Sequence, residues 1–90
     1  MTLTNEQIDE LERLALDATP GPWKVDALQI GARFNIELPD GSEAIAMTQQ
    51  LAGDRLNEKR GANADFIAAA NPLTVRALIN QLRAAQAGVN

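Results

Sequence analysis

The side chains that most often carry catalysis are scarce in this sequence. It contains no histidine and no cysteine, which excludes imidazole bases, thiol nucleophiles and the usual zinc sites. Ser42 is the single serine, and no histidine exists to activate it. Carboxylates need a desolvated cleft for acid–base work, and here they gather on one helix face and around one hairpin: Asp9, Glu10, Glu12, Glu37, Asp40 and Glu43. We therefore expect no catalytic residues, no cofactor, no metal site and no enzymatic activity.

The charge balance restricts the binding partners. Twelve acidic against eight basic side chains give a net charge of −4 over 90 residues, unlike a generic nucleic-acid binder or a polybasic membrane anchor. A local basic cluster, Arg55, Lys59 and Arg60, could still contact phosphates, with Arg33 and Lys24 as possible additions. Only one Trp and two Phe, with no Tyr, are available to stack on bases. Nucleic-acid association through this cluster is therefore an alternative rather than the first expectation.

The length and the chain start indicate the general class. Ninety residues predict a single domain covering residues 1–90 with a modest core. The N-terminus has neither the basic region nor the apolar region of a signal peptide. No stretch approaches the roughly 20 apolar residues that span a bilayer. We expect a cytoplasmic protein.

Residues 4–18 are predicted to form the first helix. Thr4 followed by Gln7 is a capping-box pattern. Apolar residues recur at helical spacing on one side: Ile8, Leu11, Leu14, Ala15 and Ala18. Leu16 lies off this stripe, so it is either covered by the following loop or available to a partner.

A three-stranded antiparallel meander is predicted next. Prolines at 20 and 22 end the helix, and strands are expected at residues 23–26, 30–38 and 43–48, with the first reversal near Gly31. Residues 39–42, Pro-Asp-Gly-Ser, form the second turn. Trp23 is interpreted as a structural anchor at the helix–strand corner, with a ligand-stacking or interface role as the alternative. Ile45 and Met47 are candidates for an open sheet face that a partner would cover.

Residues 49–62 lack a clear period and are long for a connection. They are expected to be either a simple connection, with a helical turn ending at Gly61, or a binding loop that carries the basic cluster. A short helix is predicted at residues 64–70 with Asn63 as its N-cap.

The last helix is predicted at residues 72–87. Asn71 is a preferred N-cap, worth about 1 kcal/mol, Pro72 suits the first helical position, and Gly88 suits the end. Val75, Leu78, Ile79 and Leu82 form the expected core face. A thinner stripe lies opposite and reflects either helix propensity or a surface for a partner or a second copy: Leu73, Ala77 and Ala84.

These elements predict an α+β fold in the order α-β-β-β-α-α. We expect the N-terminal and C-terminal helices to pack on one face of the sheet, with the short extra helix at an edge. The predicted core consists of apolar residues from every element: Ile8, Leu11, Ala15, Trp23, Val25, Phe34, Ile36, Leu38, Phe66, Ile67, Val75, Leu78, Ile79 and Leu82.

Two segments resemble a known family. Residues 18–23, Ala-Thr-Pro-Gly-Pro-Trp, and residues 62–72, Ala-Asn-Ala-Asp-Phe-Ile-Ala-Ala-Ala-Asn-Pro, are similar to the Ead-like proteins of bacteriophage and prophage early regions. The two segments cover about a third of the chain, and the order of elements extends over all of it. The resemblance implies a phage or prophage accessory role in the bacterial host cytoplasm, without an established enzymatic activity. The matching residues have structural explanations, so function is expected in residues 27–33 and 49–62.

Three functions follow as hypotheses. The first is a non-enzymatic accessory protein that binds a host or phage protein, in the context of host defence or of the early infection programme, with a homodimer as a further possibility. The second is a nucleic-acid-associated factor that uses Arg55, Lys59 and Arg60. The third is a small-ligand-binding or sequestering protein with a pocket between the sheet and the helices.

Overall fold

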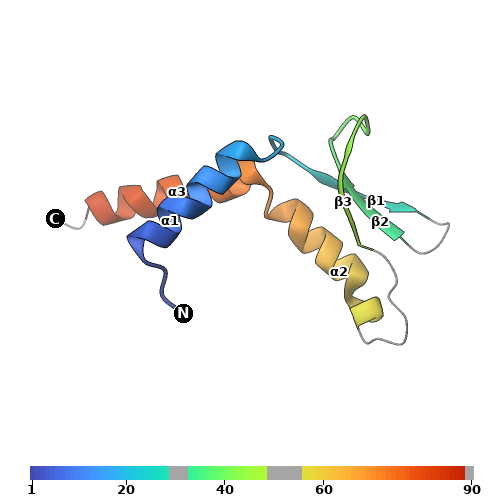
Figure 1. Cartoon of the computed structure of the whole chain (residues 1–90), viewed down its shortest axis with the longest axis horizontal. Coiled ribbons are helices and arrows are strands. Elements are labelled where there is room, and N and C mark those ends of the chain that lie inside the picture. Colours follow the sequence, from blue (N-terminus) through green and yellow to red (C-terminus); the bar gives the residue numbers. More distant parts are fainter. Residues whose placement is uncertain (29–32, 49–55, 89–90) are drawn as a thin grey trace.

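The computed structural model describes residues 1–28, 33–48 and 56–88 (Figure 1). The elements in chain order are α1 (Asn5–Asp17), β1 (Lys24–Leu28), β2 (Arg33–Glu37), β3 (Ala44–Thr48), α2 (Leu56–Ala69) and α3 (Pro72–Ala87). The predicted α+β class and the order α-β-β-β-α-α are confirmed. The reversal predicted near Gly31 lies outside the described residues.

The predicted helix ends are confirmed at α1 and α3. The Thr4 hydroxyl accepts a hydrogen bond from the Gln7 backbone N–H at 3.1 Å, and the Gln7 side chain accepts one from the Thr4 N–H at 2.8 Å. This reciprocal pair is the capping box. Asn71 caps α3, Pro72 opens the helix, and Gly88 ends it with an ordinary φ of −77°.

The three strands form an antiparallel sheet in the order β1-β2-β3. The register shifts between Ile36 and Glu37, because Ile36 pairs with Ala46 and Glu37 pairs with Ala44. Ile45 is therefore an extra residue that breaks the side-chain alternation. As a result Ile45 packs against the core while Met47 is exposed, so the expectation that both side chains share the open face was wrong for Ile45.

The turn between β2 and β3 follows its sequence pattern. Gly41 has φ of +75°, a conformation that glycine adopts without a steric penalty, and its N–H donates to the Leu38 carbonyl at 2.8 Å. The Asp40 carboxylate accepts a hydrogen bond from the Ser42 backbone N–H at 2.9 Å. Hydrogen bonds from Ser42 lower the pKa of the Asp40 carboxyl below its usual value.

This lowered pKa predicts a pH-dependent contribution of Asp40 to stability. A depressed folded-state pKa means that the contribution is complete above the unfolded pKa, about 4, and is lost as pH falls through the lower folded value. The melting temperature of Asp40→Ala should therefore lie below that of the wild type at pH 7, and the gap should shrink below pH 4. Asp40→Asn keeps an acceptor oxygen that does not titrate, so its gap from Asp40→Ala should persist at low pH. A wild-type gap that stays constant with pH would contradict the assignment.

The second helix differs from the prediction. A short helix at residues 64–70 with Asn63 as N-cap was expected, whereas α2 begins at Leu56 and Asn63 lies within it. Gly61, expected to end a helical turn, is also inside α2. The Thr48 hydroxyl donates to the Arg60 carbonyl at 2.9 Å, so the end of β3 is tied to this first part of the helix.

The helix that covers the sheet is α2, and its small residues explain why. Gly61, Ala64 and Ala68 recur at helical spacing, and both alanines are buried. A Cβ atom on Gly61 would lie only 3.3 Å from the Phe34 ring. This row of small residues, with Ile67 packed beside it, lets α2 approach the sheet closely, against a core centred on Ile36.

The expected arrangement of the other helices is corrected by this packing. α1 and α3 do not cover the sheet. They pack on each other as an antiparallel pair, which we call the hairpin although the two helices are not consecutive in the chain. The hairpin projects away from the lobe formed by α2 and the sheet (Figure 1). The molecule measures 54 × 31 × 18 Å, with a radius of gyration of 16.0 Å. A compact chain of this length would have a radius of about 12 Å, so the protein is elongated.

The core prediction is correct at its centre and wrong at its helical edges. Ile8, Ile36 and Ile79 are buried. Four residues predicted to be core are exposed instead: Phe66 at 73%, Leu78 at 61%, and Leu11 and Leu82 at 40% each. Because α2 takes the place expected for α1 and α3, the three leucines have no sheet to pack against. Phe66 belongs to α2 itself but lies two residues from the buried Ala64 and Ala68, on the other side of that helix.

Two predicted structural anchors lie at the junction between the hairpin and the lobe formed by α2 and the sheet. Trp23 is half-buried, packs against the core cluster, and donates its ring N–H to the Thr19 carbonyl at 3.1 Å. Asn71 is buried and donates to the Ala68 carbonyl at 2.9 Å. The anchor interpretation of Trp23 is consistent with these contacts.

Candidate protein-interaction surface

The candidate surface is built on the α1–α3 hairpin. The two helices run side by side in opposite directions (Figure 1), and Ile8 and Ile79 are buried between them. Both helices are amphipathic, so their apolar stripes meet along the contact. The stripes are wider than this contact, and each helix keeps part of its apolar surface exposed.

Ion pairs between α1 and α3 lie along one side of the hairpin. Arg83 on α3 donates to the Glu12 carboxylate at 2.6 Å and to the Asp9 carboxylate at 2.7 Å. These hydrogen bonds, with that to Glu12 as the largest cause, raise the pKa of Arg83 above its ordinary value. The contact joins residues more than 70 positions apart and sets the relative placement of α1 and α3 on that side.

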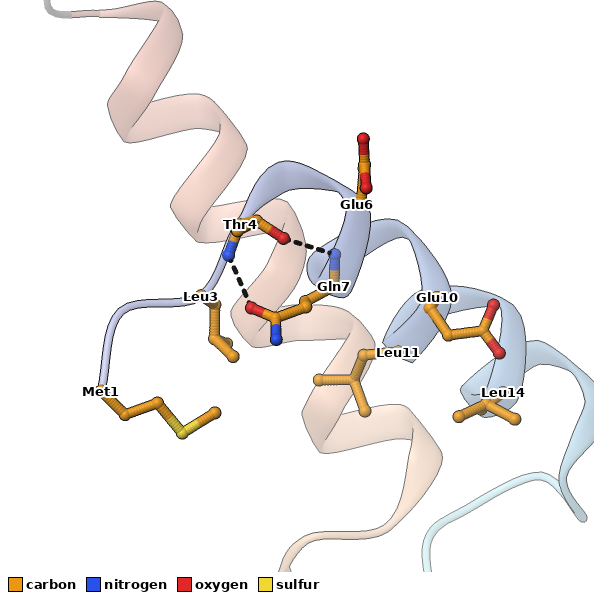
Figure 2. A pocket seen from close by; sticks show the side chains of 8 residues that line it. All are labelled: Met1, Leu3, Thr4, Glu6, Gln7, Glu10, Leu11 and Leu14. Atoms are coloured by element: carbon orange, nitrogen blue, oxygen red, sulfur yellow. Dashed lines mark hydrogen bonds between the residues drawn. The ribbon is translucent and has the colours of Figure 1, made fainter.

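The other side is apolar and carries a continuous row of leucines, which we call the leucine face: Leu3, Leu11, Leu14, Leu78 and Leu82. Each of the five is between 40% and 61% exposed. The leucine face has two parts, an open groove along α1 and a hollow of about 210 Å³ between α1 and α3. Leu3 and Leu11 line both, so they connect the two parts. Figure 2 shows Met1, Leu3, Leu11 and Leu14 directed to the same side of α1.

The edges of the leucine face differ in charge. Glu10 lines the groove on the α1 edge, and hydrogen bonding to Arg13 lowers the pKa of its carboxyl. On α3, Thr74 and Gln81 lie four residues before and three residues after Leu78, so helical spacing places them on the same side. Both are exposed and uncharged, which leaves the α3 edge without charge.

The patch predicted from the sequence lies elsewhere on the hairpin. Leu16 and Leu73 are 57% and 55% exposed, and the fold brings them together around a small hollow of about 80 Å³ that Arg76 also lines. Ala77 and Ala84 are exposed along α3, on the side that helical spacing shares with Leu73. All four residues are exposed, so the following loop does not cover Leu16, and an interaction through them stays a prediction.

The basic cluster is described only in part. Lys59 is exposed and Arg60 is half-buried near the start of α2. Arg55 and the Arg33 side chain lie outside the described residues. So do residues 29–32 and 49–55 of the two segments, 27–33 and 49–62, in which function was expected. The nucleic-acid alternative therefore stays a prediction.

Among the residues that the structure describes, no three acidic side chains come close enough to hold a metal ion. Within the same part of the chain, no helix is both long and apolar enough to cross a bilayer.

Sequence reasoning missed the leucine face because it assigned Leu11, Leu78 and Leu82 to the core. Their helical spacing indicates an apolar side but not what covers it. One sequence signal could have corrected the assignment: Gly61, Ala64 and Ala68 form a small-residue row typical of a helix that packs closely. That row predicts that α2 packs on the sheet. The apolar sides of α1 and α3 then have no sheet to pack against.

No protein-family model, curated protein or solved structure matches the chain.

Proposed function

We propose that this chain is a non-enzymatic protein-interaction module that binds another polypeptide through the leucine face. The observation that supports the proposal is the exposure of five leucines along one side of a helical hairpin. Large contiguous apolar patches on soluble proteins are typical of interaction sites. The opposite side of the hairpin carries the Arg83 ion pairs, so the two sides differ in chemistry.

The biological setting is proposed from the resemblance of residues 18–23 and 62–72 to Ead-like phage and prophage proteins. In this setting the module acts in the cytoplasm of the bacterial host as an accessory protein, and its partner is a host or phage protein. Modulation of host defence or of the early infection programme is the corresponding role. Small-ligand sequestration remains an alternative that saturable thermal stabilisation by the ligand would reveal.

Affinity capture from a host lysate with matched variants tests the proposed surface. Leu78→Asp places a charge in the leucine face, whereas Leu73→Asp places the same charge on another side of the same helix at similar exposure. Leu78→Asp should reduce recovery of the bound polypeptide by about tenfold or more. A charge buried in the interface should cost at least as much binding free energy as the loss of a central hot-spot residue. Leu73→Asp should retain it.

Nuclease treatment of the lysate provides the control for indirect capture. A polypeptide that survives nuclease and is lost only with Leu78→Asp supports the proposal. Capture that disappears with nuclease would move the assignment to the basic cluster. Loss with Leu73→Asp and not with Leu78→Asp would move the interaction to the Leu16–Leu73 patch.

A further inference from the structure

The hairpin of α1 and α3 is a single layer of secondary structure. Stable domains bury apolar surface between two packed layers. The lobe of α2 and the sheet meets this condition, with Ile36 fully buried between its layers. The hairpin of α1 and α3 has no second layer over its leucine face among the described elements.

The dimensions of the leucine face match those of a second hairpin. α1 has 13 residues and α3 has 16, so the helices are about 20 and 24 Å long, and packed helices lie about 10 Å apart. A copy laid face to face would form a four-helix arrangement. In a twofold interface each copy contributes the same residues, so ten leucines would line the contact.

The charges determine which helices face each other. α1 carries five acidic residues against one arginine, and α3 carries two arginines and no acidic residue. Contact between α1 and the same helix of the other copy would bring like charges together, with Glu10 at the edge of the face. Both arginines of α3 lie away from the leucine face, since Arg83 pairs with Asp9 and Glu12 and Arg76 lines the Leu16–Leu73 hollow. Contact between α1 and the other copy's α3 therefore places Glu10 near the uncharged Thr74 and Gln81 edge rather than near another Glu10. Like-charge contacts oppose association, so this second arrangement is favoured.

We infer that two copies of this chain associate through their leucine faces, with α1 of each copy against α3 of the other. The inference rests on the proposed function in that it specifies the polypeptide bound. The twofold axis then runs along the helices and places both sheet lobes at the same end of the dimer. The leucine face is about 20 Å long and two helices wide, so the area that it can bury is smaller than the roughly 800 Å² per partner of a standard interface. The dimer should therefore be reversible.

Sedimentation velocity from about 1 µM to about 1 mM tests the association. The mass should rise from 9.7 kDa towards twice that value with concentration. Leu78→Asp should weaken the dissociation constant by about tenfold or more, and Leu73→Asp should leave it unchanged. Circular dichroism checks that both variants are folded, which their exposed positions favour. A monomer at every concentration, or a dimer that tolerates Leu78→Asp, would overturn the inference.

Small-angle scattering tests the arrangement of the helices. With both sheet lobes at one end, the dimer should have a maximum dimension close to the 54 Å of one chain. A dimer with α1 against α1 would carry the lobes at opposite ends and be clearly longer, which would contradict the proposed pairing. A monomer in sedimentation together with capture that depends on Leu78 would remove self-association and leave the proposed function intact. Failure of both experiments would remove both.

Discussion

Replacing Ile36 with alanine is expected to lower the free energy of unfolding by about 2–5 kcal/mol, the range for a large aliphatic residue removed from a core. Ile36 is fully buried at the centre of the sheet. Its cluster contains Ala64 and Ala68 of α2, whose short side chains cannot extend to fill the cavity. The predicted cost is therefore in the middle or upper part of the range.

Urea unfolding followed by the fluorescence of Trp23 measures this loss, because Trp23 is the single tryptophan and packs against the same cluster. The control is Met47→Ala, since Met47 is 44% exposed on β3 and should cost less than about 1 kcal/mol. The melting temperature of Ile36→Ala should fall by more than 8 °C, at about 4–8 °C per kcal/mol. Equal effects of the two variants would show that Ile36 is not the centre of the core.

Replacing Gly21 with alanine is expected to cost about 2–4 kcal/mol, which combines the cost of an overpacked site with that of a lost cap. A Cβ atom at position 21 would lie 2.1 Å from Oδ1 of Asn71 and 2.7 Å from its Cγ. Asn71 cannot move without loss, because its Oδ1 accepts hydrogen bonds from the N–H groups of Leu73 and Thr74. The new methyl group would therefore displace the cap of α3.

A double-mutant cycle with Asn71→Ala separates this mechanism from a general effect on the loop. In the Asn71→Ala background the two closest contacts of the methyl group are removed and the Leu73 Cβ atom at 3.2 Å remains, so Gly21→Ala should then cost much less than in the wild type. Gly88→Ala is the control, since its Cβ would meet only ordinary contacts at 3.5 Å or more, and it should change stability by less than about 0.5 kcal/mol. Additive costs in the cycle would contradict the contact.

Asn71 shows how much of a residue's role the sequence alone predicts. Asn71 before Pro72 predicts an N-cap worth about 1 kcal/mol, and the cap is present. The sequence does not indicate that Asn71 is buried, or that it also donates to Ala68 at the end of α2 and lies against Gly21. Because a buried partner left unsatisfied adds its own desolvation cost, the expected effect of Asn71→Ala is larger than a cap alone would suggest.

The sequence by itself determined the local features: the Thr4–Gln7 capping box, the turn around Gly41 and the start of α3 at Pro72. Each depends on side chains and backbone groups within about four residues, so local pattern suffices. Tertiary structure alone decided which helix covers the sheet and which leucines remain exposed. Amphipathic spacing states that a helix has an apolar side, but the partner of that side depends on how closely each helix can approach. The small side of α2 packs closest to the sheet, and the leucine face is what that choice leaves uncovered.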